Sequence, residues 1–161
     1  SYFDLKTSGL IVFINKFVFK KNKMSAKKSW SDKLHSKKLP QTKRIDFRFA
    51  DIPAQSLMFI ATPLIIDEYI KQIPRGINVS FQTLRKDLAL DNHADCTCPI
   101  TTGIFLRIVA EANFEKYQQT NSLTEITPFW RVIEPNSPLS KKLSFGQEFI
   151  LQQRKAENIS E

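Results

Sequence analysis

The stretch 62–90, with the sequence TPLIIDEYIKQIPRGINVSFQTLRKDLAL, contains two helix signals separated by a turn. Thr62 precedes a proline, and a threonine cap followed by proline at the first helical position is typical of a helix start. Apolar residues then recur at helical spacing until Pro74, which cannot continue a helix because it has no N–H to donate. After a short extended piece, Ser80 is placed to cap a second helix over residues 81–90. The stretch therefore predicts two helices that meet at a turn.

Further elements are predicted downstream of this stretch. Apolar residues at i, i+4 and i+8 from Ile104 indicate a third helix over 101–117. Residues 126–133 and 139–143 have the composition of short extended segments, and the Pro-rich turn between them predicts a hairpin. A last helix is expected over 146–156. Together these elements predict a mainly α domain with a small β hairpin, in the order of a winged helix-turn-helix.

The charge of the chain is concentrated near its N-terminus. The whole sequence of 161 residues has a formal net charge of +8. Residues 1–23 contribute +4 and residues 24–48 contribute +6, which leaves −2 for residues 49–161. A basic segment of this kind either stays solvated or contacts an anionic partner such as nucleic acid.

Two segments precede the predicted domain. Residues 1–23 hold an apolar run that is too short for a membrane-spanning helix. We take them for a leader or an annotation artefact, with Met24 as the true start, and a membrane anchor is the rival interpretation. Residues 24–46 are rich in Lys and Ser and predict a basic, flexible tail. The folded domain is then expected over 47–161.

A set of short motifs follows one another in a fixed order along residues 62–159. They are Ile73-Pro74-Arg75-Gly76, Ser80-Phe81, Gly103, Pro128-Phe129-Trp130-Arg131-Val132 and Gly146. This ordered set resembles the C-terminal, DNA-binding domain of the O6-alkylguanine-DNA alkyltransferases, the methylated-DNA–protein-cysteine methyltransferases. The resemblance implies the winged-helix fold of that domain, with 101–117 as its recognition helix.

The chain departs from this family where the family does its chemistry. Phe129 stands where the family has its nucleophilic Cys, and Trp130 stands where it has the His that activates that thiol. A phenyl ring has no lone pair with which to accept an alkyl group, so this position cannot react. Ile100 also replaces the Arg that the family inserts into the duplex. The chain is therefore similar to the alkyltransferase-like proteins, which bind alkylated DNA without reacting and recruit other repair factors.

The resemblance also implies a structural frame around the degenerate position. Pro128, Arg131, Gly103 and Gly146 would belong to this frame. A buried arginine needs a carboxylate or carbonyl partner, and for Arg131 two candidates, Glu111 and Glu157, remain open.

Eight residues are candidates for contact with DNA. Side chains at the start of the third helix would meet phosphates, helped by free backbone N–H groups and the helix dipole, and basic side chains of the preceding helix and the wing would hold the backbone. The alternative is that these residues only cap helices or stay solvated. Glu111 and Glu115 of the same helix would also repel phosphate. The candidates are Phe81, Arg85, Lys86, Thr101, Thr102, Arg107, Lys141 and Lys142.

The loop before the third helix holds the densest group of reactive side chains. His93, Asp95, Cys96 and Cys98 lie within six positions. The spacing is poor for zinc, because two ligands at x and x+2 without a second pair do not complete a tetrahedron. A thiol at a helix start can instead be a nucleophile, with Cys98 or Cys96 as the candidate. The third interpretation is a structural loop with small buried thiols.

These observations define three functions that the sequence leaves open. The first is a non-catalytic DNA-binding protein that recognises alkylated or altered bases for repair. The second is a cysteine-dependent DNA alkyltransferase that uses Cys98 or Cys96, and the third is a winged-helix domain for protein interaction. We expect a monomer with double-stranded DNA and a repair protein as partners, without cofactor, metal or membrane contact. Two cysteines give no disulfide framework, so a cytoplasmic location is expected.

Overall fold

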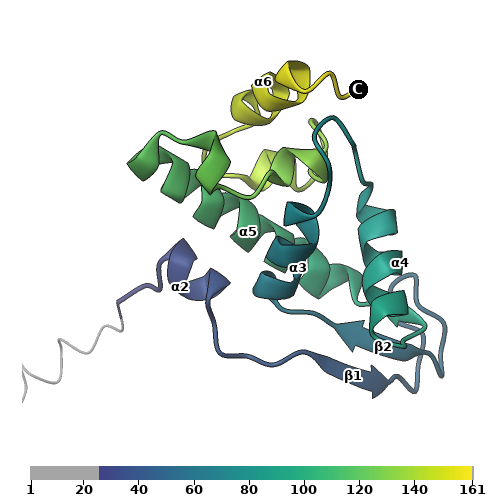
Figure 1. Cartoon of the computed structure of the whole chain (residues 1–161). Helices are drawn as coiled ribbons and strands as arrows, with labels where there is room; N and C mark the ends of the chain where they lie inside the picture. The colour runs from purple at the N-terminus through teal and green to yellow at the C-terminus, as the bar shows by residue number, and fades with distance from the viewer. Residues whose placement is uncertain (1–25, 161) are drawn as a thin grey trace, which may run out of the picture.

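The structure is a computed structural model that describes residues 26–160 (Figure 1). The predictions made for residues 1–23 and for Met24 lie outside this range. The elements are, in chain order, α2 (Trp30–Leu34), β1 (Gln41–Arg44), β2 (Leu57–Ile60), α3 (Pro63–Lys71), α4 (Phe81–Asp91), β3 (Cys96–Thr97), α5 (Pro99–Thr120), the 3-10 turns η1 (Leu123–Glu125), η2 (Phe129–Arg131) and η3 (Ser140–Lys142), and α6 (Glu148–Ala156).

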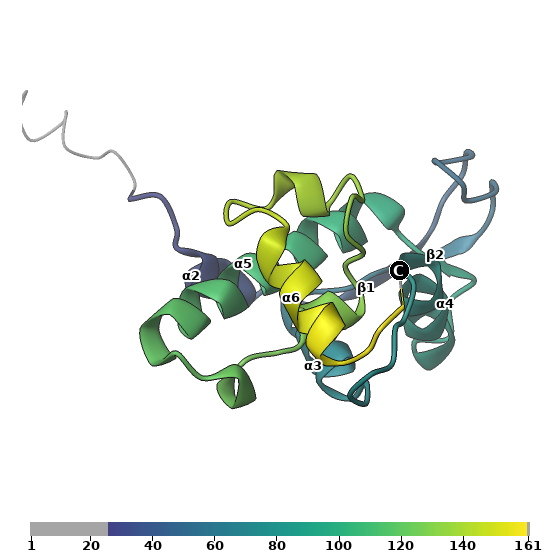
Figure 2. The same cartoon turned by 90° about the horizontal axis from the view of Figure 1, so that it is seen from above.

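Helix α5 runs through the middle of the molecule, and α2 and α3 pack against it (Figures 1 and 2). Its buried residues occupy several faces of the helix, which explains why it has no clean amphipathic stripe. Leu106, Val109 and Ala110 are at most 1% exposed and meet apolar side chains of α3, α4 and α6. A second, smaller core around Ile52, Met58 and Cys98 lies under the sheet.

The helix starts predicted from the sequence are present with their caps. The Oγ of Thr62 accepts a hydrogen bond from the N–H of Ile65 at 3.3 Å, with Pro63 at the first position of α3. The Oγ of Ser80 accepts from the N–H of Thr83 at 3.1 Å and caps α4. The mainly helical architecture with a small amount of β structure is thereby confirmed.

The sheet is built from residues other than those predicted. Strand β2 pairs antiparallel with β1, in the register Gln41↔Ile60, and parallel with β3, in the register Met58↔Cys96. Strand β1 and helix α2 both fall in 24–46, where a flexible tail is expected, so the ordered domain begins before residue 47. Figure 1 shows the sheet at one end of the molecule, next to α3 and α4.

The hairpin predicted from residues 126–133 and 139–143 is wrong. These segments form the turns η2 and η3, and no strand occurs between 126 and 143. The β-branched and aromatic residues that suggested strands are buried in the main core instead, where Ile126, Trp130 and Ile133 pack from a single irregular segment. Prolines within and between the two segments also remove the N–H groups that a ladder would need.

Candidate functional site

A groove of about 970 Å³ opens beside the first turns of α5. Helix α2, the start of α4 and the segment 132–142 form its other walls. Most of the lining is apolar, with Phe81 and Val132 on the walls and Ile100 and Ile104 from α5. Ile100 and Ile104 are 55% and 54% exposed, so an apolar surface is open to solvent here. Such a surface fits a flat or apolar ligand group.

Three cationic side chains line the same groove. They are Lys33 of α2, Arg107 of α5 and Lys142 of η3. A single carboxylate, that of Glu134, stands among the lining residues. The groove therefore combines an apolar lining with an excess of positive charge, a combination that suits an anionic ligand with an apolar part.

Trp30 forms the α2 wall of the groove. Helix α2 is held by a capping box, in which the N–H of Asp32 donates to the Ser29 Oγ at 3.0 Å and the N–H of Ser29 donates to the Asp32 carboxylate at 3.1 Å. Leu34 of the same helix is buried in the main core. The Lys33 Nζ lies 4.1 Å from the Trp30 ring centroid and the Arg107 Cζ lies 5.5 Å from it, both within cation–π distance.

Arg107 is oriented by the residue one turn further along α5. Its Nε lies 3.5 Å from a carboxylate oxygen of Glu111, while its side chain is 38% exposed. Glu111 itself is buried and accepts from the N–H of Ser144 at 2.8 Å and from the Ser144 hydroxyl. Its charge is therefore paired inside the protein, so the expected repulsion between Glu111 and phosphate does not apply.

Two of the eight predicted DNA contacts have structural roles instead. Thr102 is fully buried, and its hydroxyl donates to the carbonyl of Cys98 at 2.6 Å. Arg85 holds Asp51 with two hydrogen bonds, at 2.6 and 2.9 Å, and donates to the carbonyl of Thr97 at 3.0 Å. Short polar side chains and arginines bind internal carbonyls and carboxylates as readily as DNA, and the sequence alone does not separate the two uses.

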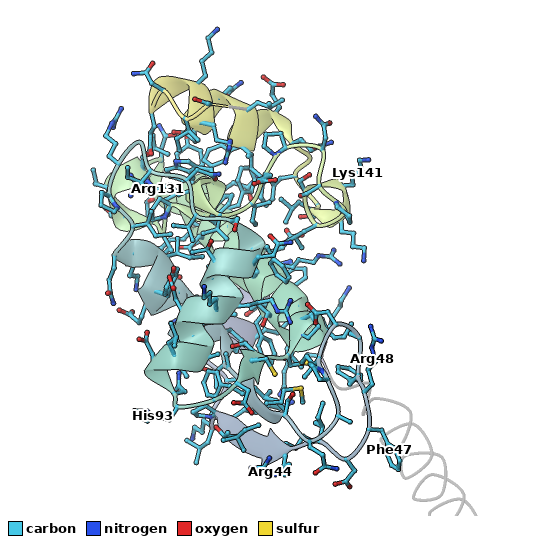
Figure 3. The ribbon with its side chains drawn as sticks, turned by 90° about the vertical axis from the view of Figure 1, so that its right-hand side faces the viewer. Arg44, Phe47, Arg48, His93, Arg131 and Lys141 are labelled. Atoms are coloured by element: carbon cyan, nitrogen blue, oxygen red, sulfur yellow. The ribbon has the colours of Figure 1, made fainter. Side chains whose placement is uncertain are left out.

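The other six candidates lie at or near the surface. Phe81, Arg107 and Lys142 line the groove together, although they come from three different elements. Lys86 on α4 and Lys141 on η3 are exposed, and Figure 3 shows Lys141 on the outer side of the molecule. The remaining candidate, Thr101, is half-buried, and its hydroxyl has no hydrogen-bond partner among residues 26–160.

The predicted frame is centred on Glu157, which the structure selects over Glu111 as the partner of Arg131. The Arg131 Nε and Nη2 donate to the two carboxylate oxygens at 2.8 Å each, and Nη1 donates to the carbonyl of Ile73 at 2.6 Å. The same carboxylate accepts from the Trp130 indole N–H at 2.9 Å and from the N–H of Gly76 at 3.0 Å. Trp130 thus shares this carboxylate with Arg131.

The electrostatics of this frame follow from its hydrogen bonds. Burial by itself raises the pKa of Glu157, because it disfavours the charged form. The hydrogen bonds from Arg131, Gly76 and Trp130 outweigh this effect and lower the pKa from 4.5 to about 2. The carboxylate is therefore ionised at any physiological pH and acts as the anchor of the frame.

The remaining frame residues have separate positions. Gly103 lines the groove, and an added Cβ would meet no atom of the described residues within 4 Å. Gly146 has a φ of +74°, a conformation that favours glycine, in the turn before α6. Pro128 directly precedes η2 and is half-buried.

Phe129, which the resemblance predicts to stand in place of a nucleophilic Cys, lies fully inside the core. Its ring centroid is 5.5 Å from that of Trp130 and 5.8 Å from those of Phe145 and Phe149. The side chain is 0% exposed. No ligand can reach Phe129 without disrupting the aromatic cluster, so the groove and Phe129 are separate places in this fold.

The loop that holds Cys96 and Cys98 has the properties of a structural loop with small buried thiols. Cys98 is 4% exposed and packs in the small core with Ile52 and Met58. Cys96 is half-buried, and burial in the first place, then the charge of Asp95, raises the pKa of its thiol. Within residues 26–160 no group of three or more His, Cys, Asp or Glu side chains is placed to hold a metal ion.

Trp30 and Lys33 of α2 line the groove but are not among the residues predicted from the sequence. The signal was present as the spacing of Ser29 and Asp32, which is that of a capping box, but the surrounding lysines favoured a flexible tail.

None of the helices in the described range is both long and apolar enough to cross a membrane. In comparisons with known proteins, no family model, no curated protein and no solved structure matches this chain.

Proposed function

We propose that this chain is a non-catalytic DNA-binding protein of the alkyltransferase-like type, which holds an altered base in the groove beside α5. The observation that carries the proposal is the groove itself, in which an apolar lining stands next to Lys33, Arg107 and Lys142. A nucleotide offers a flat, stackable base and a phosphate, the two groups that this combination suits.

The positions of the aromatic side chains support this assignment. Trp30 of α2 and Phe81 of α4 are far apart in the sequence, yet both line the groove. Aromatic side chains bind bases by stacking, which tolerates chemical alteration of the base edge. Lys33 and Arg107, the cations that contact the Trp30 ring, are the side chains that we expect to pair with the adjacent phosphates of a bound nucleotide.

The proposal does not include alkyl transfer, because no thiol lines the groove. Among the residues that line it there is no cysteine, and Cys98 is buried in the small core. The residue at the position of the family's thiol, Phe129, is enclosed by aromatic rings. Binding without alkyl transfer is the function that these groups can perform.

The test is a comparison of two duplexes that differ only in one O6-methylguanine, measured by fluorescence anisotropy at two salt concentrations. We expect a preference for the altered duplex that survives the higher salt, because contacts to the base do not depend on counterion release. Equal affinity for both duplexes at each salt concentration contradicts the proposal and favours a non-specific contact or a role in protein interaction.

A groove-filling variant separates this site from the basic N-terminal region. Gly103→Leu adds a side chain where an added Cβ meets open space, so the helix should tolerate it while the groove is blocked. We expect this variant to lose the preference for the altered duplex and to keep its weak binding to plain duplex. Gln119→Leu, at an exposed position late in the same helix, is the matched control and should behave as the unmodified protein.

A further inference from the structure

The loop between β1 and β2 presents an aromatic side chain to solvent. Phe47 is 83% exposed, and Phe49 is 42% exposed. Figure 3 shows Phe47 and Arg48 at the margin of the molecule, and Figure 2 shows the loop projecting beyond the sheet. The loop precedes the residues that carry the family resemblance, and the proposed groove does not include it.

The projecting loop is held in a fixed shape by its own backbone. The N–H of Phe49 donates to the carbonyl of Ile52 at 3.0 Å, and the N–H of Ile52 donates back at 2.8 Å. At the base of the loop, the N–H of Ile45 donates to the carbonyl of Ser56 at 3.0 Å, and the N–H of Gln55 donates to the carbonyl of Ile45 at 2.8 Å. Because these hydrogen bonds already order the loop and hold Phe47 outward, binding through Phe47 costs little conformational entropy of the loop.

Side-chain contacts also tie the loop to the helices near the groove. Asp51 accepts the two hydrogen bonds from Arg85 of α4. Ile52 is 1% exposed and packs with Cys98, the residue that directly precedes α5. The first turn of α5 lines the groove with Ile100, so the loop and the groove meet at the same helix end. Figure 3 shows Arg48 and Lys141 on the same side of the molecule.

The charge around Phe47 is positive. Lys43, Arg44 and Arg48 are all exposed, and Asp46 is the one acidic residue of the tip whose charge has no cationic partner among the described residues. The other acid of the loop, Asp51, is neutralised by Arg85, and this ion pair lowers its pKa. Arg44 donates to the carbonyl of Gln55 at 2.5 Å, but none of the three cations has a carboxylate partner among the described residues. An exposed ring among such cations is complementary to a polyanion that carries flat apolar groups.

We infer that the β1–β2 loop is a second nucleic-acid contact, in which Phe47 stacks on an unpaired base and Arg48 and Arg44 hold the adjoining phosphates. Bases offer a π-face for stacking whatever their identity, and arginine is well suited to phosphate. A lipid surface is the less favourable partner, because insertion of Phe47 would carry the neighbouring exposed Asp46 carboxylate towards the acyl chains, whereas stacking on a base leaves this carboxylate in water. The inference takes its ligand class from the proposed function, but its contact is a different one.

The test uses the full chain with three labelled probes: a blunt duplex, the same duplex with a short single-stranded overhang, and vesicles that contain phosphatidylserine. For Phe47→Ala we expect an affinity for the overhang duplex that is about 5- to 10-fold lower, which is the lower end of the range for loss of one stacked base. Affinity for the blunt duplex should change less than about twofold. Arg48→Gln should weaken binding to both duplexes and reduce the dependence on salt by about one phosphate contact.

Leu123→Ala is the matched control, because Leu123 is a partly exposed apolar residue in η1, beyond the far end of α5. It should bind all three probes as the unmodified protein does. An unchanged affinity of Phe47→Ala for the overhang duplex overturns the inference, and so does vesicle binding that depends on Phe47 while DNA binding does not. The groove variant Gly103→Leu, measured on the duplex pair with and without O6-methylguanine, distinguishes the two proposals: if it keeps the preference for the altered duplex while Phe47→Ala weakens binding to the overhang duplex, the loop contact holds and the groove assignment fails. The reverse result refutes the loop contact alone.

Discussion

Replacing Glu157 with glutamine tests the hydrogen-bonded frame around Arg131 and Trp130. The carboxylate accepts hydrogen bonds from Arg131, from the Trp130 indole and from the N–H of Gly76. Glutamine preserves the shape and can still accept hydrogen bonds through one oxygen, but it removes the charge. The guanidinium of Arg131, which is 14% exposed, is then left without its counter-ion in a poorly solvated place.

The pKa of Glu157 sets the size of the effect. A fall from 4.5 to about 2 corresponds to about 3 kcal/mol of folding free energy, since a tenfold change in an equilibrium constant is worth ~1.4 kcal/mol. Because the pKa is lower in the folded state, this contribution is fully present above the unfolded value of 4.5 and is lost as the pH falls towards about 2. By pH 3 roughly 2 kcal/mol of it should be gone.

Urea unfolding followed by circular dichroism at a series of pH values measures this directly. We expect Glu157→Gln to be less stable by about 3 kcal/mol at pH 7 and by only about 1 kcal/mol at pH 3. Other carboxylates also titrate in this range, but they are common to both proteins and cancel in the difference. A difference in stability that is constant over the whole pH range would refute the electrostatic argument, because the loss would then come from packing alone.

Three further predictions concern the interior. Phe129→Cys should take up no label from duplex that carries labelled O6-methylguanine, because the side chain at this position is enclosed in the core. Its free energy of unfolding should be lower by about 3 kcal/mol. Uptake of label would contradict this account. Asn113→Ala should cost about 2–4 kcal/mol in urea unfolding, since the buried amide donates to the Asp67 carboxylate at 3.0 Å and accepts a backbone N–H at 2.9 Å, and a loss below about 1 kcal/mol would count against this role. In maleimide labelling read by mass spectrometry, Cys96 should react slowly and Cys98 only after unfolding, because the first is half-buried and the second buried; rapid modification of Cys98 in the folded protein would reopen the nucleophile hypothesis.

Helices were predictable in this chain because their signals are local. A threonine or serine cap and a following proline depend only on neighbouring residues, and the caps at Thr62 and Ser80 form as expected. Strand assignments depend on a partner that lies elsewhere in the sequence. The residues 126–133 have the composition of a strand, but no partner segment is adjacent, and the same side chains are buried as the irregular turn around η2.

The groove was only partly predictable for a related reason. Phe81, Arg107 and Lys142 were identified as surface candidates, and the fold brings them together. Arg85 and Arg107 are indistinguishable by composition, yet one holds Asp51 and the other faces the groove. The choice depends on which carboxylate the fold brings within reach, and this is long-range information that one sequence does not contain.

Trp130 contributes a hydrogen bond to the frame around Glu157 but cannot contribute a base. An indole has one N–H and no lone pair on that nitrogen, so it can donate a hydrogen bond but cannot accept a proton. Trp130 uses its N–H to donate to Glu157 at 2.9 Å, which satisfies the buried carboxylate as an imidazole N–H would. The neighbouring Phe129 packs its ring on Phe145 and Phe149. Both side chains are committed to contacts within the core, so we expect binding at the surface next to this core.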